Sequence, residues 1–455
     1  VCSRWNGIIN SVHYLRRQKL VLYNYGKAKF FSGVGVQLLC RQKSIEFYSN
    51  AMLDTEELLD TIVKSFSTGS AMVQSLSLFL RSEHKLAFGL VVANIPNLLH
   101  LTELKISANE TLTNGVQIDS ACLEKINISF YQNSLCRLNT PRLHTLHLTV
   151  RYRSEMDLLS TVSAQLIELK VSFISKDHVA QLFGCDFSSL KVLNILLKND
   201  KYISSIIGLE TLRIADICSI FDFEFLQMFS HAKALKALTI NYFKLNGEVS
   251  ELINGFKELN YLNLEGCQRM DATKTLDLPG LQTLVMPYKQ LSLFTGSTPM
   301  KMLTTLYYNN TAKDQMNFVK QIATTFTNLT FLCLQYFDNE LDSNAFLHLN
   351  MLTKLRVLVI ENMSVSSQIY ANCPTVPQLE RLVMDTIVTE VSILDAVPAR
   401  FPSLQTFVIS NCFLYLIPTD SAKRYMTFDE LRRQMPCCRI STKDSTIFTN
   451  NAKQC

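Results

Sequence analysis

The sequence predicts an α/β solenoid with parallel strands on the concave face and helices on the convex face. Three observations predict it: a recurring apolar frame, the nearly even spacing of its copies, and helical apolar patterns between them. The chain has 455 residues, of which 47% are hydrophobic and 18% charged, so it is not a disordered protein. Only 14 Gly and 11 Pro occur, which argues against small β-sandwiches joined by flexible linkers.

The recurring frame is Leu-x-x-Leu-x-aliphatic, with positions numbered here from its first leucine. Its 14 copies start at Leu101, Leu123, Leu143, Leu166, Leu190, Leu209, Leu235, Leu259, Leu281, Leu303, Leu329, Leu355, Leu379 and Leu404. The first and last copies are 303 residues apart, so the mean step is about 23 residues, a length typical of leucine-rich repeats. In a strand at each frame, the fourth and sixth side chains point into the core, while the third, fifth and seventh point outward. The sequence therefore predicts a leucine-rich-repeat solenoid.

Further elements are expected on both sides of these frames. Weaker frames predict strands near residues 19–22, 43–47 and 73–78, and apolar residues at three- and four-residue steps predict helices at 56–66, 223–229, 249–256 and 316–326. Residues 428–440 predict a capping unit made of a helix, a proline stop and a closing strand. We expect the solenoid with this cap to span residues 17–440 and the polar residues 441–455 to be disordered.

Composition limits the partners and the compartment. The chain carries 44 Lys+Arg against 39 Asp+Glu, a net charge of +5, which gives no case for nucleic-acid or membrane binding. Residues 86–101, the longest apolar stretch, are interrupted by polar residues and proline, so no membrane helix is expected. An odd number of cysteines, 13, with no Cys-x-x-Cys pattern, favours reduced thiols in the cytoplasm or nucleus.

The sequence contains no pattern that predicts catalysis, a cofactor or a metal. Walker, Gly-x-Ser-x-Gly and His-Glu-x-x-His patterns are absent. His144 and His147 occupy positions two and five of one frame, which do not share a strand face, so exposed polar roles are expected for both. Asn109, Cys267 and Cys412 occupy ninth positions, where such repeats bond backbone, so structural roles are expected. We therefore expect a non-enzymatic binding protein.

The fifth position of each frame should lie at the middle of the concave face. The first eight of these residues are polar or basic, and the last six are mostly apolar. Together with aromatic residues at third and eighth positions, the apolar half predicts a partner-binding stripe made of Tyr261, Val285, Tyr288, Tyr307, Phe331, Tyr336, Val359, Val383 and Val408, centred on Tyr307 and Phe331. The alternative is that valine suits a strand and is tolerated on its exposed side.

The basic half of this row offers a second interpretation. Lys105, Lys170 and Arg213 would steer an acidic or phosphorylated segment of a partner. Acidic neighbours at Glu103 and Glu168 weaken this interpretation.

The first residues carry a resemblance to a known family. Val1 and Trp5 lie on one face of a predicted helix. The simpler interpretation is an ordinary helix that caps the solenoid core. The stretch VCSRWNGIIN also resembles the last helix of an F-box, in which Val1, Cys2, Arg4 and Trp5 match the pattern, and leucine-rich repeats follow it as they do in F-box leucine-rich-repeat proteins. By this resemblance, residues 1–16 are the C-terminal remnant of an F-box.

The resemblance implies a substrate-recognition subunit of an SCF-type cullin–RING ubiquitin ligase. The full F-box would bind the SCF adaptor that links it to the cullin, and the concave face of the repeats would hold the protein substrate. The opening Leu-Pro segment and first helices of an F-box are absent from this sequence, so we expect residues 1–455 to bind the adaptor weakly or not at all. The alternative is a leucine-rich-repeat scaffold or recognition receptor unrelated to ubiquitin ligation, such as an extracellular receptor or an inhibitor scaffold.

Overall fold

The computed structural model divides the chain into two compact units, residues 1–234 (unit 1) and 235–455 (unit 2). It describes residues 19–23, 43–48, 72–80, 92–108, 116–130, 136–173, 182, 185–197, 209, 212–218, 229–241, 244–269, 274–294, 300–309, 318–337, 344–415, 426–444 and 446–448.

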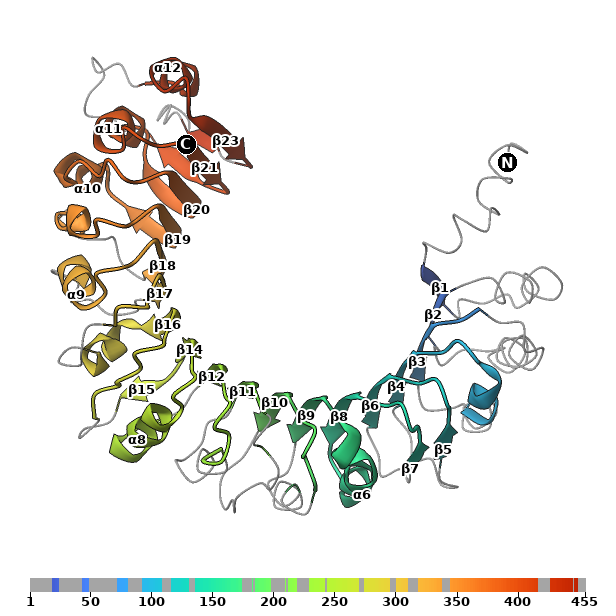
Figure 1. The fold of residues 1–455 in the computed structure, drawn as a ribbon. Coiled ribbons are helices and arrows are strands. Elements are labelled where there is room, and N and C mark those ends of the chain that lie inside the picture. The colour runs from blue at the N-terminus through green and yellow to red at the C-terminus, as the bar shows by residue number, and fades with distance from the viewer. Residues whose placement is uncertain are drawn as a thin grey trace, which may run out of the picture. The chain divides into compact units, whose positions relative to one another are not determined.

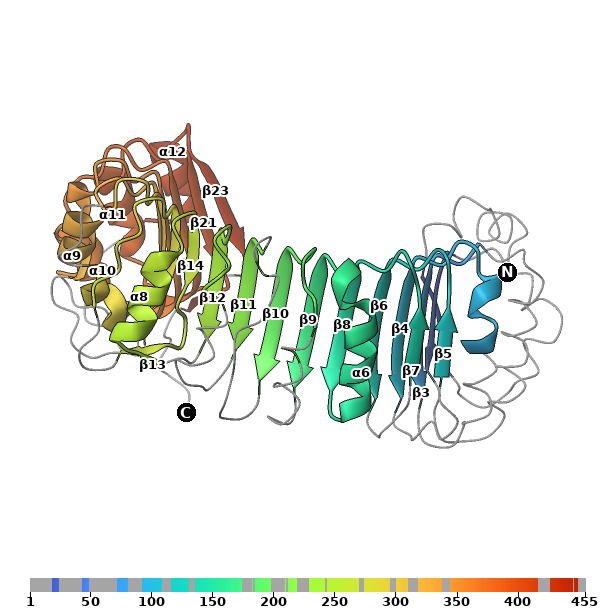
Figure 2. The same ribbon diagram turned by 60° about the horizontal axis from the view of Figure 1, so that its bottom comes forward.

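Unit 1 is built on a parallel sheet in which each strand pairs with the strand of the next repeat (Figure 1). Its strands are β1 (Lys19–Tyr23), β2 (Ser44–Tyr48), β3 (Ser75–Leu80), β4 (Glu103–Ala108), β6 (Lys125–Phe130), β8 (Thr145–Val150), β9 (Glu168–Phe173), β10 (Val192–Leu197) and β11 (Ile214–Cys218). Behind the sheet lie η2 (Ile95–Asn97), α6 (Arg153–Val162), η3 (Ser163–Gln165) and a two-stranded sheet of β5 (Val116–Asp119) and β7 (Cys136–Asn139). Figure 2 shows β4, β6, β8, β9 and β10 side by side.

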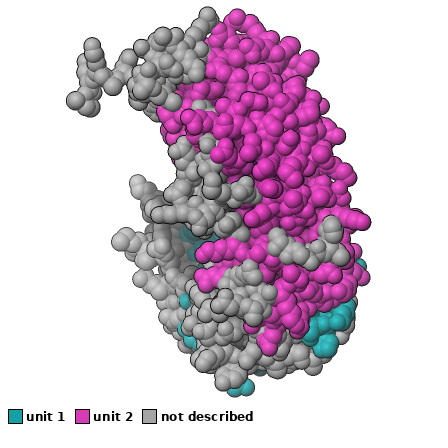
Figure 3. Space-filling view, turned by 90° about the vertical axis from the view of Figure 1, so that its left-hand side faces the viewer, with its two compact units in different colours: residues 1–234 teal, residues 235–455 magenta. Residues whose placement is uncertain are grey.

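Unit 2 repeats this arrangement. Its parallel strands are β12 (Ala237–Asn241), β14 (Tyr261–Asn263), β16 (Thr283–Pro287), β17 (Thr305–Asn309), β18 (Phe331–Phe337), β19 (Val357–Val365), β20 (Arg381–Glu390), β21 (Thr406–Ser410), β22 (Phe413–Tyr415), β23 (Arg439–Lys443) and β24 (Thr446–Phe448). Its other elements are β13 (Lys244–Leu245), β15 (Gln268–Arg269), α8 (Gly247–Gly255), α9 (Phe318–Thr325), α10 (Ser367–Asn372), α11 (Ile393–Arg400), α12 (Phe428–Gln434), η6 (Tyr288–Leu293) and η7 (Leu349–Met351). Figure 3 faces the side that α9, α10 and α11 cover.

The frames form the core as predicted. Leu355, Leu358 and Ile360, at the first, fourth and sixth positions of one repeat, are fully buried, and the other frames follow the same pattern with one exception. The three weaker frames also form strands, β1, β2 and β3. The predicted leucine-rich-repeat solenoid is therefore confirmed.

The return segments are helical only where a repeat is long enough. In the described residues, α6, α8, α9, α10 and α11 occur where frames are 23–26 residues apart, whereas β5, β7, β15 and η6 occur at steps of 20–22. A helix rises about 1.5 Å per residue and an extended chain about 3.3 Å, so a short repeat spans the strand length only with an extended or 3₁₀ segment.

Two of the four predicted helices are confirmed. Residues 249–256 coincide with α8, and residues 316–326 contain α9. The helix predicted at 56–66 and nearly all of that predicted at 223–229 lie outside the described residues.

The C-terminal cap forms, but the boundary predicted for the tail is wrong. Thr427 and Glu430 close the first turn of α12 reciprocally, with Glu430 N–H donating to Thr427 Oγ1 (3.2 Å) and Thr427 N–H donating to Glu430 Oε2 (2.8 Å). The closing strand β23 continues through Lys443, and β24 pairs with β22, inside the segment expected to be disordered. Backbone pairing with the edge of a sheet orders β23 although its residues 441–443 stay exposed.

The sixth frame is shifted by three residues from its predicted start at Leu209. Leu193 and Ile195 on β10 pair with Ala215 and Ile217 on β11, which are buried, whereas Ile214 is 44% exposed. The frame therefore starts at Leu212, so Arg213 precedes the strand and the prediction that it occupies a fifth position is wrong. The spacing indicates the same frame, because Leu212 is 22 residues after Leu190 and 23 before Leu235.

In several repeats of unit 2, the backbone bends after the first residues of the strand, at a residue in the left-handed (positive φ) conformation. Gly266, Asn362, Thr386, Asn411 and Asp444 all have φ between 52° and 73°, and the first four occupy the eighth position of their frames. In β19 and β20 the strand continues beyond this bend. Glycine, asparagine and aspartate adopt this conformation at low cost, whereas the β-branched Thr386 adopts it at a higher cost.

We expect Thr386→Asn to raise the free energy of unfolding by about 0.5–1 kcal/mol, because asparagine adopts the left-handed conformation at lower cost. The reverse change, Asn362→Thr, should lower it by a similar amount. Urea denaturation followed by circular dichroism measures both, and a destabilised Thr386→Asn variant would contradict the conformational argument.

The shifted frame is tested by a matched pair of substitutions. Ile217→Ala should cost about 2–5 kcal/mol because it leaves a cavity in the core, whereas Ile214→Ala should cost less than about 1 kcal/mol. Urea denaturation measures the difference, and the opposite ranking would restore the frame at Leu209.

Candidate functional site

The strand register of unit 2 aligns the fifth positions of six frames in one row. Val285 pairs with Tyr307, which pairs with Cys333, and the row continues through Val359, Val383 and Val408. We call the outward third, fifth and seventh positions of β14 to β23 the unit-2 strand face.

Two aromatic rings lie together on this face. The ring centroids of Tyr307 and Phe331 are 5.2 Å apart at 45°, and both side chains are half-buried. Burial raises the pKa of the Tyr307 hydroxyl, and the neighbouring Cys333, Tyr261 and Glu361 raise it further. The rings therefore present a partly desolvated apolar surface, which is the environment of strong anchor positions in protein interfaces.

The valines of the predicted stripe are less exposed than expected. Val359 is only 7% exposed and Cys333 only 1%, while Val285, Val383 and Val408 are half-buried. Side chains on strands about 4.8 Å apart cover one another, so a short side chain beside taller ones is shielded. Val359 therefore adds little to the exposed surface of the predicted stripe, whereas Val285, Val383 and Val408 stay partly exposed.

Other predicted site residues have different outcomes. Tyr261 lies half-buried at a third position of β14. Tyr288 begins η6 and Tyr336 lies in β18, but their side chains are outside what the structure describes. The adaptor-binding remnant, with Val1, Cys2, Arg4 and Trp5, also lies outside the described residues.

The ninth-position thiols bind backbone, as predicted. Cys267 Sγ donates to the carbonyl of Ile240 (3.0 Å), and Cys412 Sγ to that of Met384 (3.4 Å), each carbonyl being at the sixth position of the preceding repeat. Burial raises the pKa of the Cys412 thiol, so Cys412 is not suited to nucleophilic chemistry. Asn109 is outside the described residues.

A row of polar side chains borders the apolar row and was missed by the sequence reasoning. Seventh-position residues Gln335, Glu361, Asp385 and Ser410 lie side by side on β18 to β21. Their positions follow from the frame, but only the register shows that the two carboxylates are direct neighbours.

Exposed apolar residues were also missed beyond the bend at the eighth position. Val388 on β20 pairs with Phe413 on β22, and they are 41% and 47% exposed. No sequence signal marked them, because they follow the frame instead of belonging to it.

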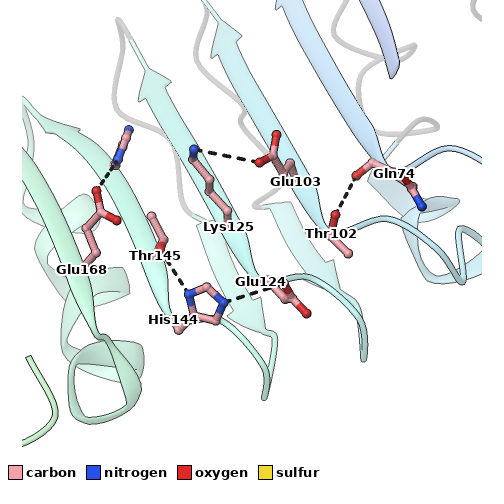
Figure 4. A network of polar contacts seen from close by, with 9 residues as sticks. Gln74, Thr102, Glu103, Glu124, Lys125, His144, Thr145 and Glu168 are labelled. Atoms are coloured by element: carbon pink, nitrogen blue, oxygen red, sulfur yellow. Dashed lines mark hydrogen bonds and ion pairs between the residues drawn. The ribbon is translucent and has the colours of Figure 1, made fainter. Parts of the chain in front are cut away.

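Unit 1 presents a face of both charges. Figure 4 shows Lys125 paired with Glu103 (3.9 Å) and His144 with Glu124 (3.7 Å). Lys105 lies over the ring of Phe79, with its Nζ 4.8 Å from the centroid.

The row of fifth positions in unit 1, part of which was predicted to be basic, contains an acidic residue. Lys105 and Lys170 are exposed at fifth positions, but the register places Asp216, not Arg213, opposite Asn194. Asn194 Nδ2 donates to Asp216 Oδ2 (2.9 Å). The row therefore has no uniform positive charge to steer an acidic segment.

His144 and His147, the two histidines of the frame at Leu143, pair with different carboxylates. His147 Nε2 lies 3.6 Å from Glu168 Oε1, whereas His144 pairs with Glu124. Burial lowers the pKa of His147, although Glu168 opposes that shift. No group of three or more potential metal ligands occurs in the part of the chain that the structure describes. Within the same residues, no helix is both long and apolar enough to cross a bilayer.

Comparisons with known proteins give a likeness to repeat structures only. No protein-family model matches the sequence, and no curated protein matches it. A leucine-rich-repeat protein of Leptospira interrogans is 16% identical, with 91% of this chain and 98% of that chain covered and a TM-score of 0.38. An internalin of Listeria monocytogenes is 12% identical, with 89% and 88% covered and a TM-score of 0.30. The leucine-rich-repeat fold of this chain follows from its own frames and strand registers.

The thiols on and near the unit-2 strand face should differ in reactivity. Burial raises the pKa of Cys333 to about 12, so almost none of it is thiolate at pH 8, whereas Cys437 is exposed. We expect iodoacetamide to label Cys437 at least about tenfold faster than Cys333. Peptide mass spectrometry of folded and urea-unfolded protein measures this, and equal labelling in the folded state would show that Cys333 is accessible.

Proposed function

We propose that this protein is a protein-binding leucine-rich-repeat scaffold whose partner docks on the unit-2 strand face. The observation that carries the proposal is the Tyr307–Phe331 ring pair, half-buried at the centre of that face. Aromatic anchors in partly desolvated surroundings supply much of the binding energy of protein interfaces. The rigid parallel sheet beneath them holds the rings in position without a partner.

We further propose that the scaffold is the substrate-recognition subunit of an SCF-type ubiquitin ligase. The resemblance of Val1, Cys2, Arg4 and Trp5 to the end of an F-box, followed by repeats, supports this role. Nine cysteines in the described residues are free thiols, which fits a cytoplasmic or nuclear protein. In this role the protein binds its substrate and the adaptor–cullin assembly, and the partners carry out ubiquitin transfer.

The double variant Tyr307→Ala/Phe331→Ala tests whether the unit-2 strand face is the docking face, meaning the surface on which the partner binds. We expect it to lose most captured partner protein, because truncating two central anchors typically costs several kcal/mol of binding. Affinity capture after proteasome inhibition, with quantitative mass spectrometry, measures the loss. Phe413→Ala removes an exposed ring from another strand and serves as the matched control. Unchanged capture by the double variant would refute the docking face.

The role as a ubiquitin-ligase subunit is tested separately, by the ubiquitylation and turnover of the captured proteins. We expect proteins captured by the wild type, but not by the double variant, to carry ubiquitin and to turn over more slowly when the protein is depleted. Captured proteins that are stable and unmodified would leave a binding scaffold unrelated to ubiquitin ligation.

A further inference from the structure

Two carboxylates lie side by side next to the aromatic centre of the unit-2 strand face. Glu361 on β19 and Asp385 on β20 are directly paired in the strand register, at the seventh positions of their frames. Both side chains are half-buried. Like charges directly opposite each other on adjacent strands destabilise a sheet, so this pair needs a compensating interaction.

Neutral donors supply part of that compensation. Gln335 Nε2 donates to Glu361 Oε2 (2.5 Å), and Ser410 Oγ (2.6 Å) and Asn411 Nδ2 (2.9 Å) both donate to Asp385 Oδ1. Among the described residues, Glu361 Oε1 and Asp385 Oδ2 accept no hydrogen bond, and neither carboxylate forms an ion pair.

The cations on the described strands next to the pair are offset from it in the strand register. Arg381 is four residues before Asp385 on the same strand, about 13 Å away along the backbone. Lys443 lies in the same row beyond Ser410, two strands and about 10 Å from Asp385. Among the described residues, no cation therefore forms an ion pair with either carboxylate, and the two lie beside an apolar surface.

The distance between the aromatic rings and the carboxylate pair determines how far apart the two contacting side chains of a bound peptide must be. Tyr307 lies on β17, two strands from Glu361 and two positions earlier in its frame. With strands about 4.8 Å apart and a rise of about 3.3 Å per residue, the backbones are about 12 Å apart. An extended peptide covers this distance in about three or four residues.

We infer that the partner segment on this face carries a lysine or arginine three or four residues from an apolar side chain. The apolar side chain packs on Tyr307 and Phe331, and the cation binds Glu361 and Asp385. The inference rests on the proposed function and adds the chemistry of the partner to it. Charge complementarity selects this occupant, because an acidic or phosphorylated segment would add a third negative group to the pair.

A display library of random twelve-residue peptides, selected against the full chain, is the first test. We expect the selected peptides to be enriched in arginine or lysine three or four residues from an aromatic or large aliphatic residue. Enrichment of acidic peptides, absence of a charge preference, or failure to select any peptide would each overturn the inference.

The selected peptide is then measured by fluorescence polarisation against three proteins. We expect Glu361→Gln/Asp385→Asn to raise the Kd about tenfold, because charge-assisted hydrogen bonds are lost while the neutral side chains keep their acceptors. Glu248→Gln/Asp429→Asn removes two exposed charges from α8 and α12 and should leave the Kd unchanged. Replacing the peptide's basic residue with glutamine should weaken wild-type binding but add little to the Glu361→Gln/Asp385→Asn loss.

The outcomes separate this inference from the proposed docking face. If Tyr307→Ala/Phe331→Ala weakens binding and Glu361→Gln/Asp385→Asn does not, the docking face stands and the basic segment is refuted. If Tyr307→Ala/Phe331→Ala has no effect, the docking face itself is refuted. Circular dichroism of each variant checks that the repeats remain folded.

Discussion

Burial of aliphatic side chains between neighbouring repeats is the constraint on which the rest of the structure depends. The first, fourth and sixth residues of a frame, such as Leu355, Leu358 and Ile360, are sealed from solvent. A single repeat buries too little apolar surface to offset the entropy lost in ordering its backbone. Neighbouring repeats share this core and pair their strands in parallel, so each repeat is stable only when stacked.

This constraint also fixes which side chains are available for binding. Because strand residues alternate between faces, burying the fourth and sixth positions turns the third, fifth and seventh outward. The register then aligns them in rows. One row is apolar and contains Tyr307, with Phe331 beside it, and one is polar, with Glu361 and Asp385 adjacent. The same frames that hold the core together therefore build a surface with an apolar centre and an acidic border.

The sixth frame shows how burial decides between competing registers. LETLRI, from Leu209, fits the Leu-x-x-Leu-x-aliphatic pattern better than LRIADI, from Leu212. The chain nevertheless buries Ala215 and Ile217 and exposes Ile214, which keeps an even step between strands. Even stacking thus outweighs the larger side chain, and it puts Asp216 in a row that was expected to carry Arg213.

The sequence by itself determined the repeat fold, the inward and outward positions, the strands of the weaker frames and the backbone-binding roles of Cys267 and Cys412. These features depend on the spacing of residues within one repeat, which can be read directly from the sequence. Only the tertiary structure decided the burial of Val359 and Cys333, the adjacency of Glu361 and Asp385, and the strands that extend beyond Ile440. Each of these depends on the side chains or the open backbone of a neighbouring strand some 25 residues away, which no pattern within one repeat specifies.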